Sequence, residues 1–230
     1  MRERPILFNG DMVRAILAGT KTQTRRPVKQ VPHWDHCGKD IMEWDLSDCY
    51  TDDDGRHWLD IQTDVDDNSH EEISCPFGQP GDRLWVRETW WQAGHAEDSY
   101  PGAGDYEVWV GSRHVHYAAN GNPPNEPNRD YPRGLQGGHF AAGDKGSIWL
   151  KRPSIHMPRW ACRLVLEIVS VRVEQAYLIS DADARAEGFS DTMTFKDSWD
   201  DIYGKGAKDA AFWGWCWVIE FKRVAATEVK

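Results

Sequence analysis

The sequence lacks any long hydrophobic run, and this absence excludes one class of protein. No stretch approaches the roughly 18 consecutive apolar residues that a membrane-spanning helix needs. The first residues, Met1 to Pro5, contain no apolar core of the kind found in a secretory signal peptide. We therefore expect a cytoplasmic protein without a membrane partner.

Cysteine is also scarce. The 230 residues include five cysteines, scattered and odd in number, so a disulfide framework is not expected. Cys37, Cys49 and Cys75 lie in one region with His33 and His36, and such side chains can bind zinc. Their spacing fits no standard zinc pattern. Two alternatives stay open: a zinc site, or loop residues with Cys75 buried at a turn.

Several familiar catalytic motifs are missing. The sequence has no P-loop, no GxSxG nucleophile elbow, no HExxH metal motif and no paired CxxC of a zinc ribbon. The chemistry must therefore be sought in a less common combination of side chains.

Charge is unevenly distributed along the chain. The formal net charge is −10, which seems to argue against a polyanionic partner. However, residues 40–72 contain thirteen acidic residues against one base, Arg56, whereas residues 1–29 carry a net charge of +5. The acidic segment is either a solvated surface loop or an arm that shields the basic patch from long polyanions.

Hydrophobic periodicity predicts short helices and strands in no regular alternation. We expect helices at residues 11–18, 180–186 and 195–203, and strands at residues 83–90, 162–174 and 213–221. Residues 28–79 and 93–147 are typical of long loops, with one short strand at 106–110. This pattern predicts an α+β fold with a small closed or half-closed β-barrel, since a doubly wound sheet needs regular alternation.

One N-terminal segment combines cationic and hydroxyl side chains. After Gly19 the chain continues as TKTQTRR. Lys21 is a surface cation, a phosphate ligand or a partly desolvated amine that activates a neighbour. Thr24 is a weak nucleophile that needs a base, for which Glu187 is the candidate. Positions 21 and 24 face opposite ways in a regular strand, so their cooperation requires the strand to begin after a turn near Thr22.

Four segments resemble the ASCH domain family, whose members have a PUA-like β-barrel. They are residues 16–25 (ILAGTKTQTR), similar to the family's G-x-K-x-x-T-x-R signature, 80–86 (PGDRLWV), 184–189 (ARAEGF) and 216–221 (CWVIEF). Residues 153–160 (PSIHMPRW) resemble a longer, phage- and prophage-type branch. The resemblance implies one domain over residues 1–230, with an acidic insertion at about 28–79 and a Gly/Pro/Asn-rich insertion at about 93–147.

A compact bacterial member of this family is an amidohydrolase that removes the acetyl group from N4-acetylcytidine. The resemblance implies that Lys21, Thr24 and Glu187 form the catalytic set, with no metal or other cofactor. Thr24, or a water that it positions, would attack the acetyl carbonyl. Lys21 would activate the alcohol or hold the oxyanion, and Glu187 would pass a proton to the departing amine.

Substrate contacts are expected from aromatic rings that stack on a base and from cations that bind ribose or phosphate. The expected substrate-binding residues are Arg25, Arg26, Trp85, Trp90, His156 and Arg159, with Trp91 and Trp160 as further stacking candidates. The core is the first expectation for each tryptophan, because thirteen tryptophans cannot all line a pocket.

Three functions stay open. The first is hydrolysis of an acylated cytosine nucleoside, which the intact Lys21, Thr24 and Glu187 favour. The second is an RNA- or DNA-binding module of phage or prophage origin, which reads a modified base or cleaves RNA as other ASCH proteins are described to do. The third is an interaction protein whose long insertions bind a protein partner.

Overall fold

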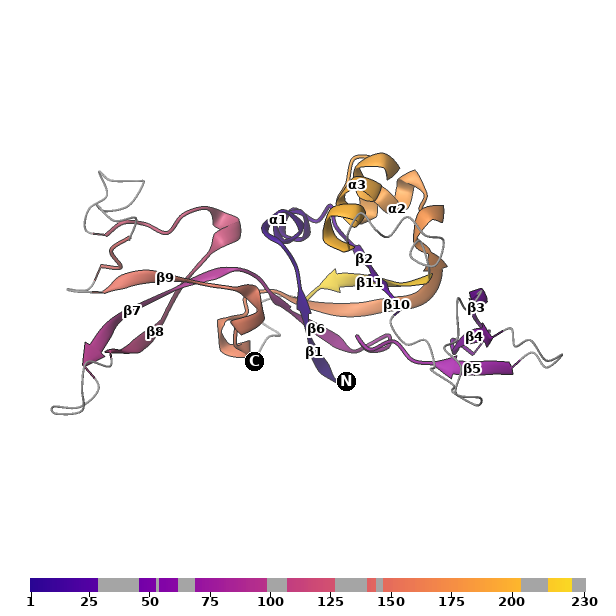
Figure 1. Cartoon of the computed structure of the whole chain (residues 1–230), viewed down its shortest axis with the longest axis horizontal. Coiled ribbons are helices and arrows are strands. Elements are labelled where there is room, and N and C mark those ends of the chain that lie inside the picture. The colour runs from indigo at the N-terminus through magenta and orange to yellow at the C-terminus, as the bar shows by residue number, and fades with distance from the viewer. Residues whose placement is uncertain are drawn as a thin grey trace, which may run out of the picture. The chain divides into compact units, whose positions relative to one another are not determined.

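The computed structural model describes residues 1–28, 46–52, 54–61, 69–98, 107–126, 140–143, 147–203 and 215–224. The protein is mixed α+β and strands predominate (Figure 1), as predicted. Contacts group the chain into two compact units, the first with residues 1–4, 15–84 and 166–230 and the second with residues 5–14 and 85–165. The single domain over residues 1–230 stays a prediction. No helix in the described ranges is long and apolar enough to cross a membrane.

The largest sheet is open. Its strands follow the order β1 (Glu3–Leu7), β6 (Arg83–Arg87), β10 (Val165–Gln175), β11 (Trp215–Arg223) and β2 (Gln23–Pro27). β11 pairs antiparallel with both β10 and β2. A barrel requires the two edge strands to pair. In the described part of the chain no ladder joins β1 to β2, so these strands do not close into the expected barrel.

Strand β11 lies in the core of the first unit. Cys216, Trp217, Val218 and Ile219 are each at most 1% exposed, so both faces of the strand are buried. The side chains of this strand alternate between its two faces. Cys216 and Val218 pack in the helix-side core, whereas the Trp217 ring meets His57 edge-on with centroids 4.9 Å apart.

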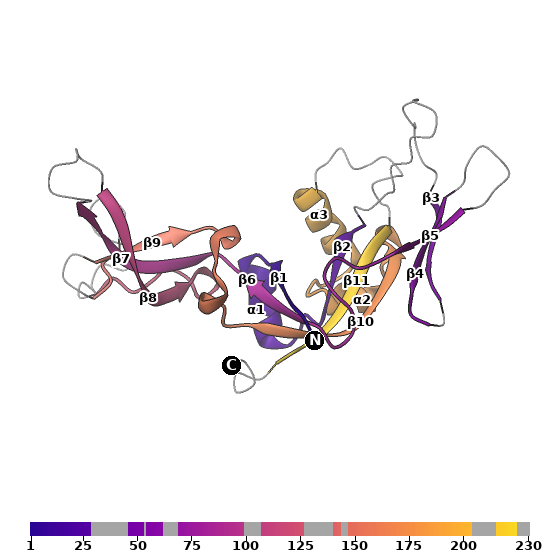
Figure 2. The same ribbon diagram turned by 90° about the horizontal axis from the view of Figure 1, so that it is seen from below.

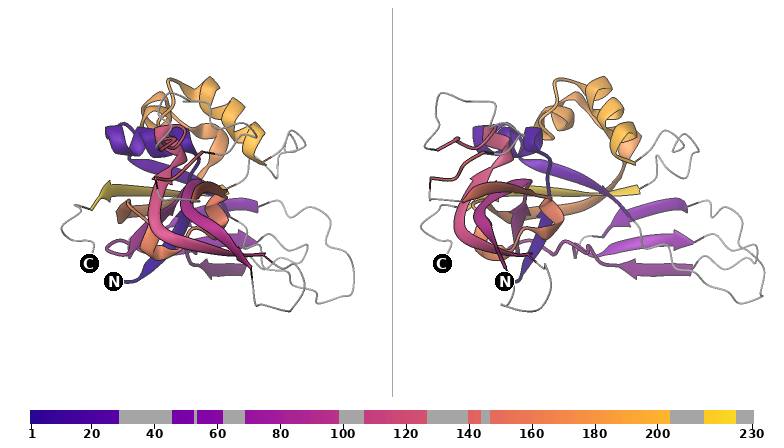
Figure 3. Two further views of the ribbon diagram at one scale, coloured as in Figure 1. Left: turned by 90° about the vertical axis from the view of Figure 1, so that its left-hand side faces the viewer. Right: turned by 60° about the vertical axis from the view of Figure 1, so that its left-hand side comes forward.

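Two helices cover the Cys216 face of β11. They are α2 (Asp181–Ala186) and α3 (Thr192–Tyr203), and they lie on the same side of the sheet in all views (Figures 1 and 3). Phe195 and Trp199 of α3 are buried against Ala184 of α2. The predicted helices 11–18, 180–186 and 195–203 correspond to α1 (Gly10–Ala18), α2 and α3.

The acidic region contains strands that the sequence analysis missed. β3 (Leu46–Thr51), β4 (His57–Ile61) and β5 (Ser69–Ile73) form an antiparallel sheet in that order (Figure 2), so the prediction of loop throughout residues 28–79 is wrong. A tight turn directs the first hairpin: the Asp52 carboxylate accepts the Arg56 backbone N–H at 2.8 Å, and Gly55 has φ of +78°. Ladder pairing here overrides the low strand propensity of acidic residues.

The second unit contains a second three-stranded antiparallel sheet. Its order is β8 (Glu107–Tyr117), β7 (Trp90–Asp98), β9 (Ile148–Arg152) (Figure 2). The predicted loop over 93–147 with a short strand at 106–110 is therefore wrong, because β8 continues to Tyr117. Gly111, a residue typical of loops, lies within this strand. A Cβ at this position would lie 2.4 Å from Nε2 of Gln92, so this glycine permits a close approach within a strand.

Candidate active site

The end of helix α1 fixes the position of Lys21. Gly19 has φ of +77°, and its N–H donates to the carbonyl of Ile16 while the Thr20 N–H donates to that of Ala15. These two bonds form a Schellman motif, which ends a helix sharply. Lys21 follows directly, and β2 begins at Gln23, so the strand starts just after Thr22, as the sequence analysis requires.

The end of helix α2 fixes Glu187 by the same device. Gly188 has φ of +89°, its N–H donates to the carbonyl of Arg185, and the Phe189 N–H donates to that of Ala184. Glu187 is the C-cap residue of this Schellman motif. At the other end of the helix, Ser180 is the N-cap residue, and its hydroxyl accepts the N–H of Asp183.

Backbone hydrogen bonds of Thr22 hold the two helix ends together. Its N–H donates to the Ala186 carbonyl at 2.8 Å, and its carbonyl accepts the N–H of Phe221 on β11 at 2.8 Å. Lys21 and Glu187, each next in sequence to one of these residues, are therefore neighbours in space although 166 positions separate them.

Lys21 and Glu187 form a buried ion pair. Nζ of Lys21 donates to Oε2 of Glu187 at 2.6 Å and to the main-chain oxygen of Glu187 at 2.7 Å. The Lys21 side chain is 0% exposed and that of Glu187 3%. Burial lowers the pKa of the Lys21 ammonium below its usual range, and the Glu187 carboxylate opposes part of this effect. The pair thus places a buried cation beside a carboxylate that can accept a proton.

Arg25 extends the pair into a network. Its guanidinium lies 2.7 Å from Glu174, 3.7 Å from Asp183 and 3.5 Å from Glu187, and its side chain is 0% exposed. This cation is buried among carboxylates, where it orients Glu187. The expected contact of Arg25 with a substrate ribose or phosphate stays a prediction.

The network reaches the surface through Arg172 of β10. This arginine pairs with Glu174, Asp183 and Glu220, and Gln23 donates to Asp183 at 3.1 Å. We call the following residues the charge network: Lys21, Arg25, Arg172, Glu174, Asp183, Glu187 and Glu220. Burial raises the pKa of the neighbouring Cys216 thiol to about 12, so this thiol is not a nucleophile at neutral pH.

Thr24 does not join Lys21 and Glu187. It lies opposite Ile219 in the β2–β11 register, whereas Arg25 lies opposite Val218 on the helix side. Directly opposed residues share a face and successive residues alternate, so Thr24 points to the other face of the sheet. No hydrogen bond between described residues connects its hydroxyl to the pair. The predicted convergence holds for Lys21 and Glu187 only.

A cavity of about 400 Å³ adjoins the charge network. Thr22 and Ala186, the sequence neighbours of the ion pair, line it together with Gln23, Asp183 and Glu220. Its polar side chains are an amide, a hydroxyl and two carboxylates. Such a lining suits an uncharged or cationic ligand that donates hydrogen bonds.

The remaining predicted binding residues are not part of this network. Arg26 is half-buried opposite Trp217. Trp85, Trp90, His156 and Arg159 belong to the second unit. Trp90 is only 3% exposed, because it packs with Met157 and Ala161 in a small core. It cannot stack on a base without unpacking that core.

The surroundings of the other candidates differ. Trp85 is half-buried, with the Arg87 guanidinium 5.5 Å from its ring centroid, and Trp91 packs against Phe140. His156 is exposed and Arg159 half-buried, whereas Trp160 is 43% exposed. Trp160 is therefore the most accessible of the predicted stacking residues.

Sequence reasoning missed the carboxylates that surround Arg25. Arg172 and Glu174 alternate with valines along β10, a strand that otherwise reads as apolar. Charged side chains within such a strand are a signal of buried ion pairs, since unpaired charges are rarely buried.

The predicted zinc ligands fall largely outside the described residues. This holds for His33, His36 and Cys37 and for the side chain of Cys49. Cys75 is half-buried, and burial raises the pKa of its thiol to about 11. Elsewhere in the described chain no three His, Cys, Asp or Glu side chains gather in a way that could hold a metal ion. Zinc binding by the N-terminal histidines and cysteines stays a prediction.

The chain was compared with family models, curated proteins and solved structures. No family model, no curated protein and no solved structure matches this chain.

Proposed function

We propose that the protein is a cytoplasmic amidohydrolase of the ASCH type that removes the acyl group from N4-acetylcytidine or a related modified cytosine nucleoside. The proposal depends on one observation, the 2.6 Å contact between the Lys21 amine and the Glu187 carboxylate. These two residues come from the two sequence segments that resemble the family's catalytic motifs. The open sheet that ends in β1 and β2 is the candidate for the PUA-like framework.

Water is the nucleophile that fits the geometry best, because Thr24 points away from the pair. In the proposed reaction water adds to the acyl carbonyl, and its proton passes to the Lys21–Glu187 pair. The oxyanion that forms is stabilised by the Lys21 ammonium. Collapse of the tetrahedral intermediate breaks the C–N bond, and the same pair returns the proton to the departing N4 amine. The products are a carboxylic acid and the cytosine nucleoside.

The substrate must reach a pair that is closed to solvent. The cavity lined by Thr22 and Ala186 is the proposed entrance. The six-residue helix α2 separates this cavity from Glu187, so productive binding requires its last turn to move. The lining carboxylates of Asp183 and Glu220 favour a neutral nucleoside over a phosphorylated one.

The direct test is incubation with N4-acetylcytidine, followed by chromatographic detection of cytidine. We expect turnover by the wild type and a loss of at least about 100-fold in Lys21→Ala and Glu187→Gln. Thr24→Val identifies the nucleophile. A small effect on turnover supports water as the nucleophile. A loss of turnover equal to that of Lys21→Ala assigns this role to Thr24.

Circular dichroism of each variant separates lost catalysis from lost folding. Absence of turnover by folded wild-type protein contradicts the proposal for this substrate. If that result is accompanied by salt-dependent RNA binding that Glu187→Gln leaves unchanged, a nucleic-acid-binding module is the better assignment.

A further inference from the structure

Arginines lie over tryptophan rings on the three-stranded sheet of the second unit. The Arg113 guanidinium is 5.6 Å from the ring centroid of Trp160, and that of Arg152 is 5.8 Å from Trp109. A cation within about 6 Å of an aromatic centroid is attracted to the face of the ring. Two such pairs therefore place rings and positive charges side by side.

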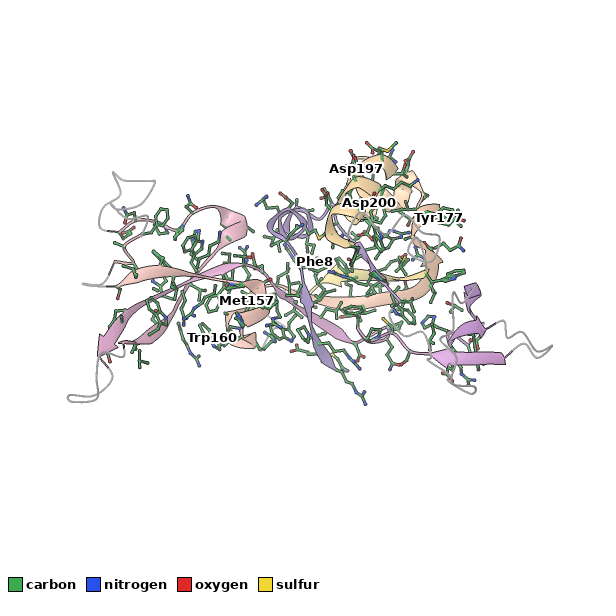
Figure 4. The ribbon with its side chains drawn as sticks, viewed as in Figure 1. Phe8, Met157, Trp160, Tyr177, Asp197 and Asp200 are labelled. Atoms are coloured by element: carbon green, nitrogen blue, oxygen red, sulfur yellow. The ribbon has the colours of Figure 1, made fainter. Side chains whose placement is uncertain are left out.

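The two pairs share one face of the sheet. In the strand register, Trp90 lies opposite Arg152 of β9 and Ala96 lies opposite Trp109 of β8. Trp160 belongs to a 3₁₀ turn beyond β9 (Figure 4) and meets Trp90 edge-on with centroids 5.8 Å apart. We call Trp109, Arg113, Arg152 and Trp160 the Trp–Arg face.

The backbone is adapted to hold Trp109 against the sheet. A Cβ on Gly94 would lie 2.4 Å from the main-chain oxygen of Val110 and 2.6 Å from Cζ2 of Trp109, closer than any side chain permits. Glycine in the interior of a strand weakens the strand, and it is expected where another group must approach closely. Gly94 therefore makes room for both the Val110 carbonyl and the indole.

In the part of the chain that the structure describes, the charges on the Trp–Arg face have no acidic partner. Among the described residues, no carboxylate lies within ion-pair distance of Arg113 or Arg152. Trp160 is 43% exposed and Arg113 is also exposed. An exposed indole beside guanidinium groups is suited to a ligand that is both aromatic and anionic.

We propose that the Trp–Arg face binds single-stranded nucleic acid. Unpaired bases present ring faces on which indoles stack, and the backbone presents phosphates to cations, so rings and charges alternate in the ligand as they do on this face. A duplex hides its base faces and does not fit. The proposal does not depend on the amidohydrolase activity, because every residue of the face lies in the second unit.

The test is fluorescence anisotropy of the full chain with labelled 20-nucleotide oligo-U and oligo-dT, at several salt concentrations. The two oligonucleotides distinguish RNA from DNA. We expect Trp160→Ala to weaken binding about 5- to 150-fold, the effect of losing one stacked base. Arg152→Gln should lower the slope of log affinity against log salt by about 0.7, the value for one phosphate contact on a single strand.

Lys151→Gln is the matched control. Lys151 precedes Arg152 on β9, carries the same charge and lies 5.6 Å from the Trp91 ring on the opposite face. We expect this variant to bind within about twofold of the wild type. Arg113→Gln gives a second variant in case Trp160→Ala perturbs the contact with Trp90.

Three results would overturn the proposal. The first is no oligonucleotide binding at low salt by folded protein. The second is equal weakening by Lys151→Gln and Arg152→Gln, which would indicate unspecific attraction. The third is self-association that Trp160→Ala abolishes without any oligonucleotide binding, which would assign the face to a protein contact. Loss of nucleoside turnover in Arg152→Gln is not expected, so the two proposals can fail separately.

Discussion

The Lys21 ammonium donates to both the carboxylate and the main-chain carbonyl of Glu187, at 2.6 and 2.7 Å. Glu187 caps the C-terminus of α2, where the helix dipole disfavours a negative charge and favours a positive one. The lysine therefore gives a hydrogen-bond donor to both the carboxylate and the main-chain carbonyl of Glu187. Without that donor, burial of these two groups would destabilise the fold. This relationship explains why both residues are tolerated inside the protein, whether or not they act on a substrate.

The first prediction concerns the stability of this pair. Lys21→Met and Glu187→Leu should each lower the free energy of unfolding by about 3–5 kcal/mol, because each leaves a buried charge without its nearest partner. The double variant should lose clearly less than the sum of the two. Urea denaturation of the four proteins measures the coupling. Additive losses would mean that the two charges do not interact.

The second prediction concerns Arg25, whose guanidinium touches three carboxylates. Arg25→Lys keeps the charge but loses the planar fork that reaches several partners at once. We expect a loss of about 1.5–3 kcal/mol, the usual value of hydrogen bonds to charged groups. Arg185→Lys, on the exposed surface of α2, is the control and should change the stability by no more than about 0.5 kcal/mol. Equal effects in the two variants would show that the contacts of Arg25 contribute nothing special.

Helix positions could be predicted because local signals determine them. Gly19 and Gly188 follow the ends of α1 and α2 with positive φ, and Ser180 caps the start of α2. Each acts within one turn of its helix, so the sequence alone reveals it. The same signals placed Lys21 and Glu187 at helix ends, from which the backbone bonds of Thr22 bring them together.

Long-range pairing could not be predicted in this way. Whether Thr24 meets Glu187 depends on which face of β2 turns toward α2, and a shift of one residue in register reverses the answer. β8 was truncated in the prediction because Gly111 is a loop signal in isolation and a packing requirement in the sheet. The partners of Arg25 lie about 150 residues away on β10 and α2, beyond any periodicity.

The third prediction concerns Gly188. Its φ of +89° strains any side chain, and a Cβ would lie 3.1 Å from Cβ of Ala15 and 3.3 Å from Cβ of Lys21. Gly19 has a similar φ of +77° but no atom within 4 Å of such a Cβ. Gly19→Ala should therefore cost about 1–2 kcal/mol from backbone strain alone. Gly188→Ala should cost more and should also displace Lys21.

Thermal and urea denaturation of both variants measure this difference. If the proposed amidohydrolase activity is found, Gly188→Ala should reduce it far more than Gly19→Ala. Equal losses of stability in the two variants would show that Ala15 and Lys21 move away from the added Cβ without a loss of folding free energy.

The fourth prediction concerns acid stability. Burial alone would raise the pKa of Asp183, but hydrogen bonds from Ser180 and Gln23 and the charges of Arg25 and Arg172 outweigh burial and lower it. The unfolded chain therefore binds this proton more readily than the folded protein. The stabilisation is complete above the unfolded pKa of about 3.9 and is lost as the pH falls through the lower folded pKa. Asp183→Asn removes it at every pH.

The difference in unfolding free energy between wild type and Asp183→Asn should thus be constant from pH 7 to about 5 and shrink below about pH 4. Urea midpoints at half-unit intervals of pH between 7 and 2.5 measure it. Asp201→Asn, at an exposed position on α3, should differ little from the wild type throughout. A gap for Asp183→Asn that persists unchanged to pH 2.5 would mean that its carboxylate charge does not stabilise the fold. The hydrogen bonds of α2 would then depend on the shape of the side chain alone.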